Sequence, residues 1–215
     1  MAIKWLIDAS YFVAAILFIL GLKGMSSPVS ARKGIVWAGV GMVLATVVTF
    51  LTPGMNNFAL MVIAIALGGA VAWISGKKVA MTDMPQMVAI YNGMGGGAAA
   101  AIAAVEFARG EMHGTVVTLL ATLGALIGAV SFSGSVVAWA KLQGVMKKAF
   151  RLPAQNAVNI VLALVTVAVG GAIVIAPAID PLLVGAFFVL ALLLGVIITL
   201  PIGGADMPVV ISLFN

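Results

Sequence analysis

The stretch PLLVGAFFVLALLLGVIITL occupies residues 181–200 and contains no charged side chain. A helix needs about 20 consecutive apolar residues to cross the roughly 30 Å hydrocarbon layer of a membrane. Over all 215 residues, 64% are hydrophobic and 8% are charged, and the mean hydropathy is +1.27. A soluble core of this size could not bury so much apolar surface, so the stretch predicts a transmembrane helix.

Similar apolar stretches recur along the whole chain, and none of them alternates polar and apolar residues as the strands of a membrane barrel do. The sequence therefore predicts an all-α, polytopic transmembrane helix bundle that forms a single domain over residues 1–215. An eighth span begins near residue 207 and is too short to cross by residue 215, so we expect the native protein to continue. The seven complete spans are expected near residues 5–22, 34–51, 58–75, 85–106, 114–140, 157–178 and 181–200.

The basic residues indicate the orientation of the spans. Nine of the eleven follow the first, third and fifth spans, which by the positive-inside rule places these loops in the cytoplasm and the amino terminus outside. We expect the chain to be integral to the inner (plasma) membrane. The basic residues are scattered between apolar runs, which argues against a nucleic-acid partner. The nine are Lys23, Arg32, Lys33, Lys77, Lys78, Lys141, Lys147, Lys148 and Arg151.

Two segments 123 positions apart align without a gap: TDMPQMVAIYN at 82–92 and ADMPVVISLFN at 205–215. Asp, Met, Pro and Asn coincide. We expect each segment to start a helix, because the Asp carboxylate can cap the first turn and Pro needs no amide donor there. The charge pattern puts Asp83 and Asp206 at the cytoplasmic end of their helices.

Each segment also carries an Asn nine residues after its Asp. Nine residues of helix rise about 13 Å, which brings Asn92 and Asn215 near the middle of the bilayer. An amide without a partner in hydrocarbon is costly, so each must face a polar group, another helix or water. The pair fits interhelical hydrogen bonding, and it fits equally a proton or ion path with the two carboxylates at its mouth.

Other polar residues could extend such a path. Ser131 and Ser135 can share one helix face, where they bond backbone carbonyls or line the path, whereas Ser133 cannot share it. Glu106 could mark an exit or be an interfacial charge, and the single histidine, His113, is expected in a solvated outer loop. The glycines at 93 and 95–97 lie within a span and predict close helix packing, not a phosphate-binding loop. No metal-ligand spacing and no catalytic set appears, and there is no cysteine.

Four segments together resemble the beta subunit of proton-translocating NAD(P) transhydrogenase, through most of the chain and in order. The resemblance implies the proton-conducting membrane domain of an enzyme that transfers hydride between NAD(H) and NADP(H). It implies that this chain alone is not catalytic and holds no cofactor, because NAD(H) binds the alpha subunit and NADP(H) a soluble domain of beta beyond Asn215. The four segments are YFVAAILF at 11–18, MTDMP at 81–85, GSVVA at 134–138 and GGADMPVV at 203–210.

The resemblance also implies partners and residue roles. The partners are the alpha subunit, the NADP(H) domain of the beta subunit, membrane lipid and a second copy in a homodimer of the complex. Asp206 matches a carboxylate beneath the NADP(H) domain, and Asn215 matches a polar residue linked to the proton path. Where Asn92 stands, well-known members have a protonatable His. An amide cannot exchange a proton at physiological pH, so the proton-carrying group is expected partly outside this chain.

Two other functions fit the residues taken by themselves. A secondary ion or solute transporter would use the two mid-membrane Asn residues to hold its substrate. A noncatalytic membrane scaffold subunit would use the same residues and the glycine-rich faces for packing only.

Overall fold

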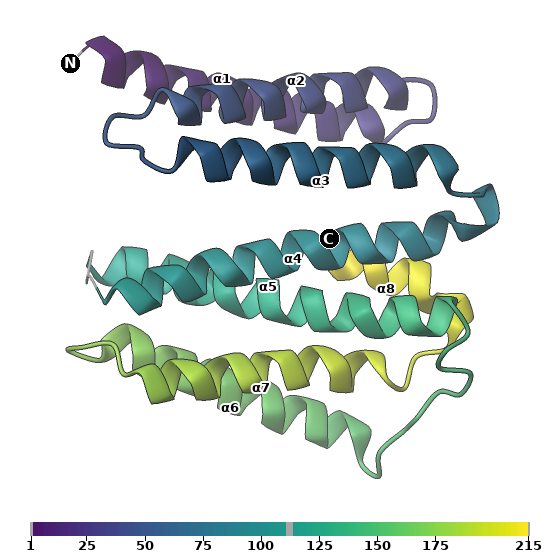
Figure 1. The fold of residues 1–215 in the computed structure, drawn as a ribbon. Coiled ribbons are helices and arrows are strands. Elements are labelled where there is room, and N and C mark those ends of the chain that lie inside the picture. Colours follow the sequence, from purple (N-terminus) through teal and green to yellow (C-terminus); the bar gives the residue numbers. More distant parts are fainter. Residues whose placement is uncertain (1, 111–113, 215) are drawn as a thin grey trace. The chain divides into compact units, whose positions relative to one another are not determined.

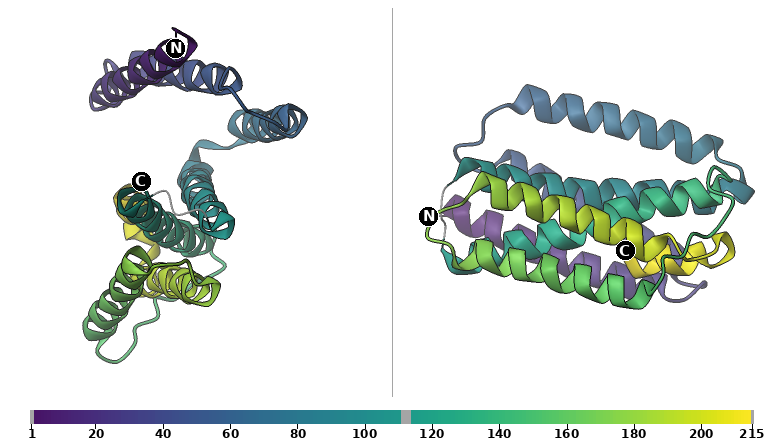
Figure 2. Two further views of the ribbon diagram at one scale, coloured as in Figure 1. Left: turned by 90° about the vertical axis from the view of Figure 1, so that its left-hand side faces the viewer. Right: turned by 90° about the horizontal axis from the view of Figure 1, so that it is seen from below.

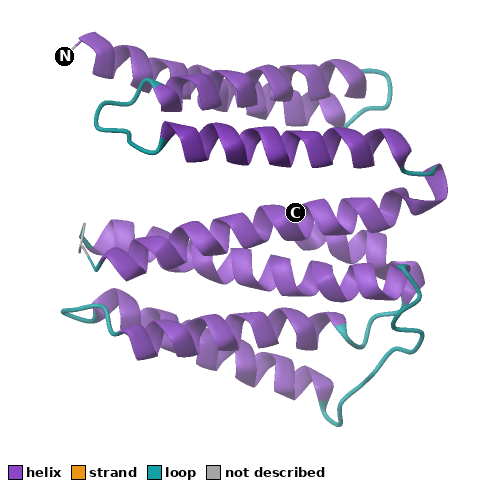
Figure 3. Ribbon diagram, in the orientation of Figure 1, coloured by secondary structure: helices purple, strands orange, loops and turns teal. Residues whose placement is uncertain are grey.

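The computed structural model describes residues 2–110 and 114–214, and over these residues it contains helices and loops without a strand (Figure 3). The all-α prediction is confirmed. Within these described residues, seven helices are long and apolar enough to cross a membrane. The elements are α1 (Ala2–Met25), α2 (Ala31–Phe50), α3 (Phe58–Lys78), η1 (Met81–Asp83), α4 (Met84–Arg109), α5 (Thr115–Leu142), α6 (Gln155–Ile175), α7 (Pro181–Thr199), η2 (Gly204–Asp206) and α8 (Met207–Phe214), where η denotes a 3-10 helix (Figure 1).

The helix limits depart from the hydropathy limits where local backbone chemistry intervenes. The sixth helix ends at Ile175, three residues before the expected limit, because Ala176 precedes Pro177 and takes an extended conformation with φ −66° and ψ 142°. The helical region is sterically disfavoured for a residue before proline. Hydropathy alone does not report this, because Ala176 and Ala178 are as apolar as the helix itself.

The chain divides into two compact units, Met1–Lys77 and Lys78–Asn215. In the first unit, α1 and α2 pack through glycine: a Cβ added to Gly34 would lie 2.6 Å from the carbonyl oxygen of Gly21. The hydroxyls of Tyr11 and Thr49 also bond across this pair at 2.9 Å. Helix α3 has no buried residue within the unit.

In the second unit, α5 lies against α4 on one side and α7 on the other, and α6 lies beside α7 (Figures 1 and 2). The α4–α5 contact depends on glycine, because a Cβ on Gly128 would lie 2.6 Å from the carbonyl oxygen of Gly96. The prediction that the glycines of this span serve close packing is confirmed for Gly93, Gly96 and Gly97 and is wrong for Gly95, where an added Cβ would meet nothing within 4 Å. A cluster of buried apolar side chains near the beginning of α5 joins Phe107 of α4, Ile173 of α6 and Phe187 of α7.

The two Asp-Met-Pro segments fold alike, as their shared sequence predicts. In each, a 3-10 turn ends at the Asp and an α-helix begins at the Met. The expected carboxylate cap is wrong for Asp83, whose side chain makes no capping bond. A capping residue has an extended backbone, whereas Asp83 has φ −100° and ψ 1° because it closes the 3-10 turn.

Asp180 shows what a capping aspartate requires. It directly precedes Pro181, which holds its backbone extended at φ −90° and ψ 115°, and its carboxylate accepts a bond from the Leu182 amide at 2.9 Å. Asp83 is followed by Met84, which is already helical at φ −54° and ψ −43°, and no proline directly after Asp83 holds its backbone extended. The two aspartates thus differ in backbone conformation, and only the extended one caps its helix.

Candidate functional site

A polar cluster lies between α4 and α5, well inside both helices. The Asn92 Nδ2 donates to the Ser135 Oγ at 2.9 Å and lies 3.5 Å from the Ser131 Oγ. Ser135 is fully buried, Ser131 is 4% exposed, and Asn92 is half-buried. Ser131 and Ser135 are four residues apart on a helix, so they share the face that meets Asn92. The structure thus brings together three residues that the sequence singles out.

Two glycines of α4 allow α4 and α5 to approach each other closely at this cluster. A Cβ on Gly93 would lie 3.1 Å from the Ser135 Cβ, and one on Gly96 would lie 2.9 Å from the Ser131 Cβ. Small residues let two helix backbones come close enough for short polar side chains to bond between them. The glycines and the polar residues therefore form one feature of the α4–α5 interface.

A groove opens beside the cluster and contains both polar and apolar surface. Its volume is about 540 Å³, and Tyr91, Asn92 and Ser131 supply its polar side chains. Gly95 and Gly124 line it without filling it, since a Cβ on either would meet nothing within 4 Å. A cavity of this size holds several waters if polar partners are at hand, and these side chains supply them.

Ser133 lies on the opposite side of α5. It is buried and donates to the Ala129 carbonyl at 3.0 Å. Its Oγ is so close to Gly195 of α7 that no side chain would fit there. Ser133 therefore belongs to the α5–α7 contact and is excluded from the cluster, as helical spacing predicts.

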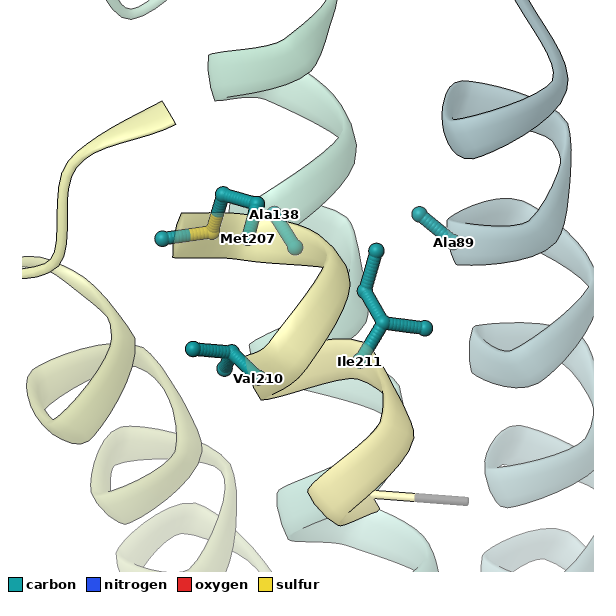
Figure 4. Close-up of a cluster of buried hydrophobic side chains, with 5 residues drawn as sticks. All are labelled: Ala89, Ala138, Met207, Val210 and Ile211. Carbon is teal, nitrogen blue, oxygen red and sulfur yellow. The ribbon is translucent and has the colours of Figure 1, made fainter. Parts of the chain in front are cut away.

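Helix α8 begins next to the cluster. Its buried side chains Met207, Val210 and Ile211 pack with Ala89 of α4 and Ala138 of α5 (Figure 4). Ala89 lies three residues before Asn92, and Ala138 lies three residues after Ser135. The second Asp-Met-Pro segment is consequently packed directly beside the residues that hold the Asn92 amide.

Three other predicted residues, Asp83, Asp206 and Glu106, are not part of this cluster. Asp83 and Asp206 are exposed, in the 3-10 turns that precede α4 and α8. Glu106 is half-buried and lies 14 residues beyond Asn92 on α4, about 21 Å along the helix axis, so it is not brought to the cluster. Asn215 and His113 lie outside the described residues.

Lys141 was counted in the sequence as a loop charge, but the structure places it in the last turn of α5 with 7% of its surface exposed. Its Nζ donates to the carbonyls of Thr199 at 2.9 Å, Leu200 at 2.5 Å and Ile202 at 2.6 Å. The first two carbonyls end α7 and the third lies in the following loop. The carboxyl end of a helix has unsatisfied acceptors and a partial negative charge. No local pattern could reveal this role, since the three acceptors lie about 60 residues away in sequence.

The arrangement can order water, but it offers no group that exchanges a proton near neutral pH at the cluster itself. Amides and hydroxyls donate and accept hydrogen bonds without changing charge. Among the described residues, no group of three or more His, Cys, Asp or Glu side chains is placed to hold a metal ion. The chemistry of the site is therefore that of a polar pathway between apolar helices.

Comparison with known proteins assigns the chain to a family. The family model described as the NAD(P) transhydrogenase beta subunit matches residues 7–215. The NAD(P) transhydrogenase subunit beta of Rhodospirillum rubrum is 40% identical over 218 residues, which cover 96% of this chain and 46% of that protein. The same subunit from a named strain of that species matches with identical values. The chain thus spans about half the length of the curated relatives it matches. These comparisons give no support to a secondary transporter or a scaffold subunit.

Proposed function

The chain belongs to the family of NAD(P) transhydrogenase beta subunits, and from this premise we propose that it is the proton-conducting membrane domain of such an enzyme. Its seven apolar helices and its family make it an integral membrane protein. In the proposed role it couples proton movement across the membrane to hydride transfer between NAD(H) and NADP(H), which bind to domains outside this chain.

The observation that carries this proposal is the bond between Asn92 and Ser135 beside the α4–α5 groove. A half-buried amide that only joined two helices would need no open groove next to it. Here Asn92 uses Nδ2 to bond Ser135 and also lines the groove, where its amide oxygen can accept a hydrogen bond from water. Asn92, Ser131 and Ser135 then hold a water file, and the proton moves along the water.

Coupling requires that the cytoplasmic face sense the state of the path. In our proposal Asp206 is the sensor, because it ends the turn before α8, and α8 packs against the helices on either side of the Asn92 cluster. A shift of this turn would displace Met207 and Ile211, which contact α4 and α5. Asp83 occupies the equivalent turn before α4 and is proposed to act in parallel. Glu106, near the far end of α4, would mark the other mouth of the path.

The proposal assigns partners by chemistry. A domain that carries NADP(H) would dock over Asp206, and an alpha subunit would supply NAD(H). Because an amide cannot carry a proton, the titrating group that completes the path would come partly from another chain. A homodimer of the complex in lipid is the assembly proposed. The ends of α1 and α3 that carry Lys23 and Lys78, and the loop that contains Lys148, would face the cytoplasm, as the positive-inside rule predicts.

The test is proton pumping by the reconstituted full enzyme with the substitution Asn92→Leu. We expect pumping per hydride transferred to fall by about tenfold or more, because an apolar side chain cannot reproduce the hydrogen bonds of an ordered water. Hydride transfer in detergent, where no gradient forms, reports that the nucleotide domains are intact. Ser133→Ala is the matched control, since it removes a buried hydroxyl of α5 that faces α7, and it should pump normally. Undiminished pumping by Asn92→Leu would exclude Asn92 from the path.

A further inference from the structure

A second cavity lies at the end of the unit where α6 begins and α7 ends, and most of its surface is polar. Its volume is about 710 Å³. The lining comes from the first two turns of α6, three residues just before that helix, and the segment that joins α7 to α8. Its polar side chains are Arg151, Gln155, Asn156, Asn159 and Asp206.

An apolar groove continues from this cavity along α6 and α7. Its volume is about 550 Å³, and it shares the lining residue Ala157 with the polar cavity. The polar cavity is lined by residues within 154–159 at the start of α6 and by residues 201–203 just after α7. The groove is lined by residues within 157–165, further along α6, and by residues within 193–197 in the last turns of α7. Figures 1 and 2 show α6 and α7 side by side here. The groove side chains are Val158, Val161, Leu162, Val165, Leu193 and Ile197.

Hydrogen bonds of Gln155 hold α6 and α7 together where the polar cavity meets the apolar groove. The Gln155 Nε2 donates to the Ile197 carbonyl at 3.1 Å and to the Asn159 Oδ1 at 3.0 Å, while its Oε1 accepts from the Leu152 amide at 2.9 Å. Because the Asn159 oxygen is already bonded to Gln155, its Nδ2 donors are the groups left for a ligand. Half-buried Gln155 thus ties α6 to α7 and leaves the cavity with hydrogen-bond donors that suit an anionic oxygen.

The cavity contains one cation and one anion. Among the described residues, the structure gives neither the Arg151 guanidinium nor the Asp206 carboxylate a hydrogen bond or an ion pair. A guanidinium beside amide donors suits a phosphate, which it can bind through two parallel hydrogen bonds. A carboxylate in the same cavity suits an ammonium group and disfavours a second negative charge.

We propose that this composite site binds a zwitterionic phospholipid with a primary amine in its headgroup. Arg151 and Asn159 bind the phosphate, Asp206 binds the ammonium, and one acyl chain lies in the groove between α6 and α7. The start of α6 is where an apolar span meets its basic loop, the level at which lipid phosphates lie. A free phosphate would leave the groove empty, and an anionic lipid would bring its extra charge to Asp206.

The test measures lipid retained by the full-length protein, purified in mild detergent and titrated with phosphatidylethanolamine under native mass spectrometry. We expect one tightly bound lipid per chain. Arg151→Gln should weaken binding at least about tenfold, since a hydrogen bond to a charged group is worth about 1.5–3 kcal/mol and 1.4 kcal/mol is tenfold. Val161→Trp, which fills the groove, should weaken it at least as much.

Matched controls separate the site from general lipid contact. Lys148→Gln removes an exposed charge of the same loop outside the cavity. Ile160→Trp enlarges a neighbouring α6 side chain that is as exposed as Val161, both at 59%, and lines neither cavity. Both controls should bind lipid normally, and all four variants must show unchanged helix content and size-exclusion profiles.

Three results would overturn the proposal. One is equal lipid loss in site and control variants. Another is tight binding of a probe that lacks one part of the lipid. Phosphatidylglycerol bound as tightly as phosphatidylethanolamine would remove the role of Asp206. Inorganic phosphate or glycerophosphoethanolamine bound as tightly would remove the role of the groove. The third is retention of lipid only after the soluble domains are removed, which would identify the cavity as their docking surface. None of these readouts depends on turnover, so they are independent of the proton-path proposal.

Discussion

At the scale of single residues, Asn92 shows how a polar side chain is accommodated between apolar helices. Its amide has one good partner, the Ser135 hydroxyl at 2.9 Å, and one marginal partner, the Ser131 hydroxyl at 3.5 Å. Hydrogen bonds weaken steeply with distance, so these two serines are not equivalent. The burial of Ser135 further protects its bond from competition by lipid headgroups or water.

This difference predicts the outcome of double-mutant cycles between Asn92→Ala and each serine changed to Ala. The Asn92–Ser135 coupling should be about 0.6 kcal/mol and at most about 1.7 kcal/mol, the range for polar pairs between membrane helices. The Asn92–Ser131 coupling should be smaller. Unfolding in mixed micelles by added denaturing detergent gives both values. Equal coupling to the two serines would contradict the geometry described for this cluster.

At the scale of secondary-structure elements, the end of α7 depends on a side chain from α5. Lys141 donates to three carbonyls at the end of α7 and in the loop that leads into η2 and α8. A cation at a helix carboxyl terminus also interacts favourably with the helix dipole. The position of the Asp206 turn is therefore set partly by a residue on another helix.

Lys141→Met should destabilise the second unit by about 1–3 kcal/mol, because it keeps the length of the side chain but removes a charged donor from three carbonyls, of which those of Thr199 and Leu200 keep only a backbone donor at 3.2 Å. The effect should be local as well: amide exchange in residues 200–206 should accelerate more than exchange in α4. Lys148→Met is the control, since Lys148 is exposed. If hydrogen exchange in the α7–α8 loop were unchanged, Lys141 would not be what holds it.

At the scale of the whole molecule, the order of helices and the distribution of charge define a topology. Charges concentrate in alternate loops, and the chain contains no cysteine. Single cysteines can therefore be introduced as unique labels without a background reaction.

A membrane-impermeant thiol reagent applied to intact spheroplasts should label Asn56→Cys and Ala178→Cys. It should label Ser27→Cys and Lys148→Cys only after the membrane is opened, because their loops are basic and positive loops remain in the cytoplasm. All four positions are exposed, so accessibility in the folded chain does not limit labelling. The reverse pattern would invert the proposed orientation and place Asp206 on the outer face.

The sequence by itself determined the class of the protein, the approximate helix ranges and the starts of α4 and α8. These depend on interactions along a few consecutive residues: apolar length, proline positions and basic loops. The same locality explains why the Gly-rich part of α4 was assigned to packing, and why helical spacing separated Ser133 from the other two serines.

Only the tertiary structure decided which groups meet across helices. The Asn92 bond to Ser135 joins residues 43 apart, and the Lys141 bonds join residues about 60 apart. The cavity of Arg151 and Asp206 likewise depends on where α6 lies against the loop after α7. Such contacts depend on the rotation and crossing of packed helices, which glycine positions such as Gly96 and Gly128 set through backbone approach. A pattern within one helix cannot report the face that its neighbour presents.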